Sequence, residues 1–295
     1  MQFPDTSSPI PRGADPALAL RTRHAQAQAA LGTSAFGEPL CLRSIEAGSH
    51  AEGEVLAELA HPLAEVAARL RSGAALGALL FLHQNVRACH ALPARDGEQL
   101  TLTFGPKQTR PDAVRYAVDY LLRVEADRPD YLRVVLQARR EPLAMRGHRI
   151  EFEAVSLPER VPGGGSFVRV AYAHDGGLHG RLALQAYLTA TGDGKIGFTS
   201  VGQDDQGRPV PVRGERGVLE RNVMRCYLAL KASLAPVVGS PAQALRARLR
   251  LWHGLTERYP AQLHELSLED YLAEKAADLA AGALDPADTG RLRWA

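Results

Sequence analysis

Two arginines, Arg221 and Arg225, stand one helical turn apart in the densest polar patch of the chain, residues 214–225. A guanidinium group can donate two parallel hydrogen bonds to a carboxylate or phosphate, so both residues are candidate anion contacts. In the alternative interpretation, Glu220, Arg221 and Arg225 form a solvated helix face with a structural ion pair to a neighbouring sheet. We favour this alternative, because a forked contact needs an anionic partner that the spacing does not indicate.

A glycine-rich segment, GDGKIG at residues 192–197, matches the G-x-G-x-x-G pattern of dinucleotide-binding loops. Such a loop binds a pyrophosphate where it joins a strand to a helix, whereas here it follows a predicted helix with no strand before it. Ile196 also occupies the position where a phosphate-binding P-loop has a Ser or Thr for magnesium. We therefore predict no nucleotide cofactor.

Other catalytic and metal-binding patterns are incomplete. His264 begins an H-E-x-x-H pattern, but Leu268 stands where the second histidine is required. Cys41, Cys89 and Cys226 lie far apart and form no C-x-x-C pair. No G-x-S-x-G nucleophile motif occurs. The sequence thus predicts no metal site, no cofactor and no catalytic residue.

Length and charge narrow the classes of partner. The 295 residues include 35 basic and 33 acidic side chains, a formal net charge of +2, which excludes binding of nucleic acid by charge alone. The longest apolar stretch, residues 74–82, is far shorter than the roughly 20 residues that span a bilayer, so we expect no integral membrane association. The first 20 residues lack the apolar run of a signal peptide. We expect a cytoplasmic protein, or a periplasmic one if this start is trimmed or misassigned.

The elements that position these side chains follow from hydrophobic periodicity. Residues 1–15 indicate a disordered lead-in, and Asp15 with Pro16 predicts the start of an N-terminal helical segment, residues 16–38. Alternation predicts eight strands, the last six of which form an antiparallel meander with one solvated and one buried face. They cover residues 39–44, 53–60, 85–92, 99–104, 116–126, 131–138, 149–157 and 166–174. A period of 3.6 residues predicts helices over 62–71, 74–83, 178–191, 215–235, 241–258 and 267–281.

This order of elements, with the phrases ELAHPLAEVAARL and SFVRVAYAHDGGLHGRLALQAYL, resembles the START-like helix-grip fold of the SRPBCC superfamily. The segments KIGFTSVG, ERNVMRCYLAL and TERYPAQLHELSLEDYL resemble an uncharacterised proteobacterial branch of that superfamily. The resemblance covers residues 39–235 and implies an α+β fold in which an antiparallel sheet wraps a long helix. The helix is either 178–191 or 215–235. Residues 236–295 would be a C-terminal helical extension packed on this domain.

The resemblance also implies a cavity between sheet and helix for a small hydrophobic ligand such as a lipid, sterol or polyketide. Its lining would be Leu102, Tyr120, Leu122, Val134, Phe152, Val170 and Tyr172 from the sheet, with Leu182, Tyr187 and Tyr227 from helices. The tyrosines would supply the few polar groups that apolar pockets need. The alternative is that these side chains simply fill a core.

Three functions follow, and we favour the first. It is non-catalytic binding or carriage of a small hydrophobic ligand. The second is an enzyme of the same superfamily, resembling an aromatase, cyclase or hydrolase. That enzyme would need a titratable group on the buried face, where the alternation places tyrosines and His174, while Asp119, Arg133 and Glu153 point outward. The third is a protein-interaction module formed by the C-terminal helices.

Overall fold

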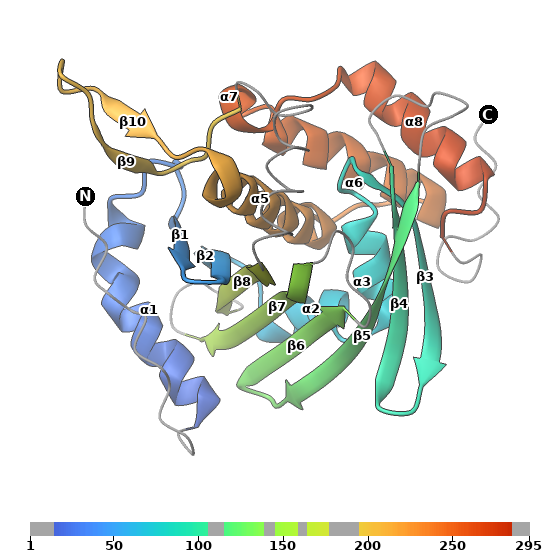
Figure 1. Ribbon diagram of the computed structural model, residues 1–295. Helices are drawn as coiled ribbons and strands as arrows, with labels where there is room; N and C mark the ends of the chain where they lie inside the picture. Colours follow the sequence, from blue (N-terminus) through green and yellow to red (C-terminus); the bar gives the residue numbers. More distant parts are fainter. Residues whose placement is uncertain (1–14, 106–114, 139–144, 159–163, 177–194, 285–295) are drawn as a thin grey trace.

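The computed structural model describes residues 15–105, 115–138, 145–158, 164–176 and 195–284. In these ranges the chain forms an α+β structure with one large antiparallel sheet, a separate two-stranded hairpin, and helices on both faces of the large sheet (Figure 1). No helix in this part of the chain is long and apolar enough to cross a membrane. Most of the predicted lead-in and the predicted helix over 178–191 fall outside the described residues.

The large sheet has eight strands in the order β1-β2-β8-β7-β6-β5-β4-β3. Pairing of β2 with β8 joins the first hairpin to the end of the predicted six-stranded meander, so segments far apart in sequence become neighbours. The strands are β1 (Leu40–Ala47), β2 (His50–Leu59), β3 (Val86–Ala94), β4 (Gly97–Phe104), β5 (Tyr116–Asp127), β6 (Tyr131–Ala138), β7 (Met145–Leu157) and β8 (Gly165–Gly176). The hairpin consists of β9 (Ser200–Gln203) and β10 (Pro209–Pro211).

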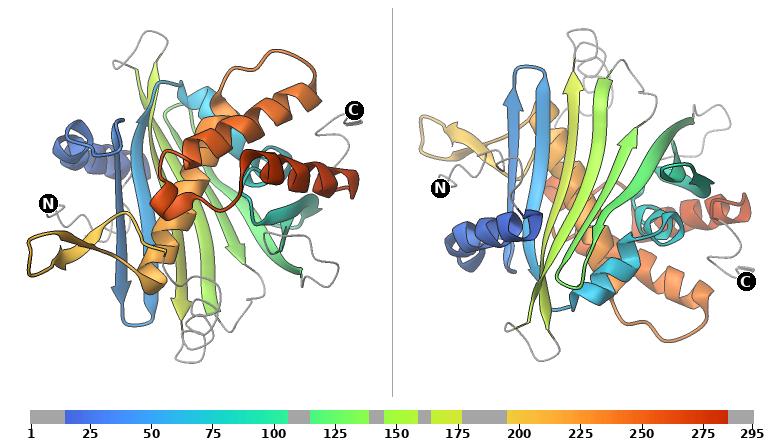
Figure 2. Two further views of the ribbon diagram at one scale, coloured as in Figure 1. Left: turned by 90° about the horizontal axis from the view of Figure 1, so that it is seen from above. Right: turned by 90° about the horizontal axis from the view of Figure 1, so that it is seen from below.

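One face of the sheet, called the inner face, packs against helix α5 (Gly214–Leu234), as Figure 2 shows. The apolar side chains of α5, such as Val223 and Leu230, are fully buried and belong to one continuous core with the sheet. Of the two candidate helices for this position, the described part of the chain places α5 there. The short helices α2 (Leu63–Leu70) and α3 (Gly73–Leu80) connect β2 to β3 and complete the core.

Helix α5 approaches the sheet closely at Gly53 of β2. A Cβ atom at this position would lie 3.0 Å from the backbone carbonyl carbon of Leu219. Gly53→Ala should therefore lower the free energy of unfolding by roughly 1 to 3 kcal/mol, because the helix must move away from a close-packed surface. Urea unfolding measures this loss. Gly202→Ala in β9, where a Cβ atom meets nothing within 4 Å, is the control, and equal losses for both variants would contradict the close approach.

The C-terminal residues continue the same core. Helix α6 (Pro241–Thr256) packs on α5, and α8 (Leu268–Ala280) packs on α6 and on β3, with the single turn α7 (Pro260–Leu263) between them. Trp252 of α6 and Tyr271 of α8 are each 1% exposed, and their rings lie 5.4 Å apart. Helix α7, which is only four residues long, has no counterpart among the helices predicted from the sequence.

Helix α1 (Pro16–Gly32) covers part of the opposite, outer face of the sheet. Asp15 caps it by accepting a hydrogen bond from the backbone of Ala17, as the Asp-Pro pair predicts. On one side of α1, Leu20 and Leu31 pack against Phe167 and other apolar side chains of the outer face.

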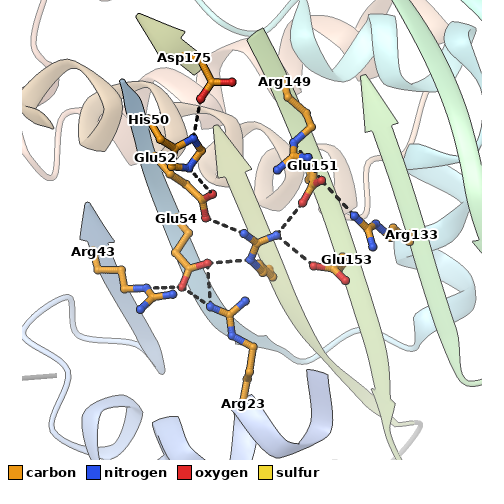
Figure 3. Close-up of polar contacts among 11 residues, drawn as sticks. Arg23, Arg43, His50, Glu52, Glu54, Arg133, Arg149, Glu151, Glu153 and Asp175 are labelled. Carbon is orange, nitrogen blue, oxygen red and sulfur yellow. Dashed lines mark hydrogen bonds and ion pairs between the residues drawn. The ribbon is translucent and has the colours of Figure 1, made fainter. Parts of the chain in front are cut away.

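The outer face beside α1 is a buried ionic network and not a solvated surface, which corrects the prediction from alternation (Figure 3). Arg169 of β8 contacts four carboxylates on the flanking strands β2 and β7. Its nitrogens lie 2.7 Å from Glu52, 2.7 Å from Glu54, 2.8 Å from Glu151 and 3.0 Å from Glu153. The alternation identified the correct side of each strand, but it contains no information about what covers that side.

Candidate functional site

The seven lining residues predicted from the sheet do lie on its inner face. Six of these side chains are nearly fully buried in the core: Leu102, Tyr120, Leu122, Val134, Phe152 and Val170. The predicted helix residues Leu182 and Tyr187 fall outside the described residues. A surface hollow of about 620 Å³ has a different lining, formed by Ser44, Ile45, Glu46, Gly48 and Arg216. Most of the predicted lining residues therefore pack as a core. The candidate site is defined instead by the polar side chains on this face.

Tyr120, His148 and Tyr172 form a hydrogen-bonded chain on the inner face, which we call the relay. The Tyr120 hydroxyl lies 2.9 Å from Nδ1 of His148, and Nε2 of His148 hydrogen-bonds the Tyr172 hydroxyl. The three residues come from β5, β7 and β8. Tyr120 reaches across β6 because its partner on that strand, Ala138, has only a methyl side chain. The imidazole is thus held at both nitrogens by phenolic oxygens.

Burial keeps the relay uncharged. His148 is 5% exposed, and burial, with a smaller contribution from His174, lowers its pKa to about 4. Burial likewise raises the pKa of both Tyr120 and Tyr172. A neutral imidazole between two protonated phenols is therefore the form present at neutral pH.

This shift makes stability depend on pH. In the unfolded chain the pKa of histidine is about 6.5, so between pH 6.5 and 4 the unfolded state binds more protons and stability falls as the pH is lowered. From pH 7 to pH 5, wild type should lose about 2 kcal/mol more than His148→Gln, whose amide can still donate and accept in the relay. Urea unfolding at each pH measures this difference. Identical losses would show that His148 titrates normally in the folded protein.

The relay lies toward an aromatic and partly exposed end of the inner face. Tyr116 and Tyr120 share a face of β5, and Tyr116 is 49% exposed. Its ring stacks on Phe104 of β4 at 5.4 Å between centroids. Tyr172 is half-buried, and the nearby Tyr116 and Cys226 add to the effect of burial on its pKa. Among the described residues of the predicted lining, Tyr172 is thus the one whose side chain is partly exposed.

The remaining predicted residues do not join the relay. The Tyr227 hydroxyl donates to Glu38, in the segment before β1, at 3.3 Å. Arg221 donates to the backbone carbonyl of Ile196 at 3.1 Å. Arg225 donates to Glu265 at 2.8 Å, and burial lowers its pKa to about 9.

The solvated helix face predicted for Glu220, Arg221 and Arg225 is wrong, because all three residues are buried. Both arginines already have acceptors within the chain. The carboxylate that accepts from Arg225 comes from the segment before α8 and not from the sheet. The described residues also include no group of His, Cys, Asp or Glu side chains that could hold a metal ion.

His148, the central residue of the relay, is not among the site residues predicted from the sequence. The predicted strand began at residue 149, one position too late, whereas β7 begins at Met145. His148 has the same parity as Ile150 and Phe152, which point inward. Extending the alternation by one residue would have placed an imidazole on the buried face beside the two tyrosines.

Comparisons with protein-family models and with curated proteins give no match for this chain. Among solved structures, CalU16 from Micromonospora echinospora is similar over 73% of this chain and 94% of its own, with 12% sequence identity and a TM-score of 0.28. A TM-score this low identifies neither a fold nor a function.

Proposed function

We propose that this protein is a helix-grip protein that binds or carries a small hydrophobic ligand at the relay end of the inner face. The arrangement of elements supports the fold: a hairpin, two short helices, six further strands and a long helix across the inner face. Residues 39–235 would form this domain, and the C-terminal helices pack on it.

The observation that supports ligand binding is the relay itself. A core is most stable when it is apolar, because each buried polar group needs a partner to offset its desolvation. Here three linked polar groups lie on a largely apolar face, next to the aromatic pair Phe104 and Tyr116, of which Tyr116 is exposed. Ligand pockets have this composition: mostly apolar and aromatic, with a few placed polar groups that fix orientation.

Titration with the neutral dye Nile red tests the proposal. Wild type should bind the dye saturably, and Tyr116→Glu should weaken binding at least tenfold, because an apolar ligand at this end would desolvate the new charge. Val201→Glu in the exposed hairpin makes the same charge change on a side chain 60% exposed and should leave the dissociation constant unchanged. Unsaturable binding, or equal binding by all three proteins, would contradict a site at the relay.

An acid–base enzyme is the second candidate, because a neutral imidazole linking two hydroxyls is a path for proton movement. The enzyme hypothesis and the carrier hypothesis predict different effects of His148→Gln. A carrier should keep its ligand affinity and show no turnover before or after the change. In an enzyme, the change should abolish turnover of a bound substrate while its affinity stays within a few-fold.

A further inference from the structure

The hydrogen-bonding capacity of the relay is set by its central imidazole. A neutral imidazole has one N–H donor and one lone pair. Its two phenolic partners therefore play different roles: one tyrosine donates its O–H to His148, and the other accepts the N–H of His148. The accepting tyrosine keeps its own proton, so the relay always has one O–H donor without a partner inside it.

The difference in burial between the two tyrosines indicates which of them carries the O–H donor without a partner in the relay. Tyr120 is 1% exposed, and in the described part of the chain its hydroxyl contacts only His148. An unpaired donor there would be desolvated without compensation. The Tyr172 side chain is partly exposed, whereas that of Tyr120 is not, so an unpaired donor costs less at Tyr172 than at Tyr120. The favoured arrangement has Tyr120 donating to Nδ1 and Nε2–H donating to the Tyr172 oxygen, which leaves the Tyr172 O–H available.

We infer that the Tyr172 hydroxyl selects apolar ligands that carry a hydrogen-bond acceptor without a donor, such as a ketone or ester carbonyl. This inference rests on the proposed function and identifies the ligand class for the same site. A carbonyl accepts the available proton and leaves no polar group unpaired.

An alcohol of the same shape fits the relay less well. If its oxygen accepts from Tyr172, its own proton is left without an acceptor in the relay. If it instead donates to Tyr172, the relay must reverse, and the unpaired proton moves to the buried Tyr120 hydroxyl. Either arrangement leaves one donor unpaired. Tyr172 is thus the specificity residue, and Tyr120 is a positioning residue that acts through His148.

Three probes that share one ring system test the inference: 2-acetylnaphthalene, 1-(2-naphthyl)ethanol and 2-ethylnaphthalene. Dissociation constants come from calorimetric titration. Wild type should bind the ketone about tenfold more tightly than the hydrocarbon, the ratio for one net hydrogen bond. It should bind the alcohol several-fold less tightly than the ketone. Tyr172→Phe should reduce the ketone preference below about twofold and leave the affinity for the hydrocarbon nearly unchanged.

Tyr120→Phe separates the relay from a simple Tyr172 contact. Without the Tyr120 donor, His148 can accept the Tyr172 proton, so the ketone preference should fall several-fold although residue 120 is buried away from solvent. A preference that persists in either variant, or equal binding of ketone and alcohol by wild type, would overturn the inference while the proposed function stands. Failure of all three probes to bind wild type would overturn the proposed function and the inference with it. Thermal melts confirm that each variant is folded.

Discussion

Replacing Arg169 by methionine should lower the free energy of unfolding by about 3 to 5 kcal/mol, the usual cost of removing one partner from a buried ionic cluster. Methionine fills a similar volume, so lost charge and not lost packing dominates. The variant leaves Glu54, Glu151 and Glu153, which are 1%, 3% and 7% exposed, close together without the cation they share. Urea unfolding at pH 7 measures the loss.

Arg149→Met is the matched control for this prediction. The Arg149 side chain is 38% exposed, and within the described ranges its ion pair is with Glu151 alone, at 3.1 Å, so its loss should cost less than about 1 kcal/mol. A similar cost for both variants would contradict a central role for Arg169.

The loss of stability caused by Arg169→Met should also depend on pH. Burial alone would raise the pKa of Glu54, but Arg169 and two further arginines outweigh it and lower the pKa to about 2. A depressed pKa contributes stability above the unfolded value near 4.5, and this stability is lost as the pH falls from 4.5 toward 2. Arg169→Met should therefore lose less stability than wild type over that interval, and a larger loss would contradict the assigned charge.

Replacing Trp252 by alanine should cost about 3 to 5 kcal/mol, because a large buried ring leaves a cavity that its neighbours fill only partly. The ring is 1% exposed, and its indole N–H donates to the backbone carbonyl of Arg225 on α5 at 3.2 Å. Thermal or urea unfolding measures the loss. Its neighbour Leu251 is 39% exposed, and Leu251→Ala should change stability by less than about 0.5 kcal/mol.

Trp252→Ala and Leu251→Ala also test the hypothesis that the C-terminal helices form a protein-interaction module. A loss below about 1 kcal/mol for Trp252→Ala would mean that α6 is peripheral, as a detachable interaction surface requires. The expected large loss means that α6 stabilises the helix lying across the inner face.

Periodicity predicted most of the fold because each strand has one apolar face. Alternation in Val168, Val170 and Tyr172 identifies the inner side of β8 without any tertiary information. The same pattern marks Arg169 as outward, but its burial depends on a helix more than 130 residues away and on carboxylates from two other strands. Such long-range contacts leave no local signal.

The candidate site was predicted in part for a related reason. Tyr120 and Tyr172 were recognised because they lie inside clear alternating runs. His148 was missed because it lies near the start of a strand, where boundaries are the least reliable part of a prediction. Tyr227 has the correct spacing for the buried stripe of α5, yet its hydroxyl donates to Glu38. The spacing of residues on a helix does not determine which partner a side-chain hydroxyl reaches.

Native mass spectrometry of the protein purified from the cells that express it, with no ligand added, tests the central claim most directly. Wild type should carry a non-covalent adduct of lipid size. Tyr116→Glu should lose it, and Val201→Glu should retain it. A bare mass for wild type together with no thermal shift from apolar carbonyl compounds, or an adduct equally occupied in all three proteins, would contradict ligand binding at the relay.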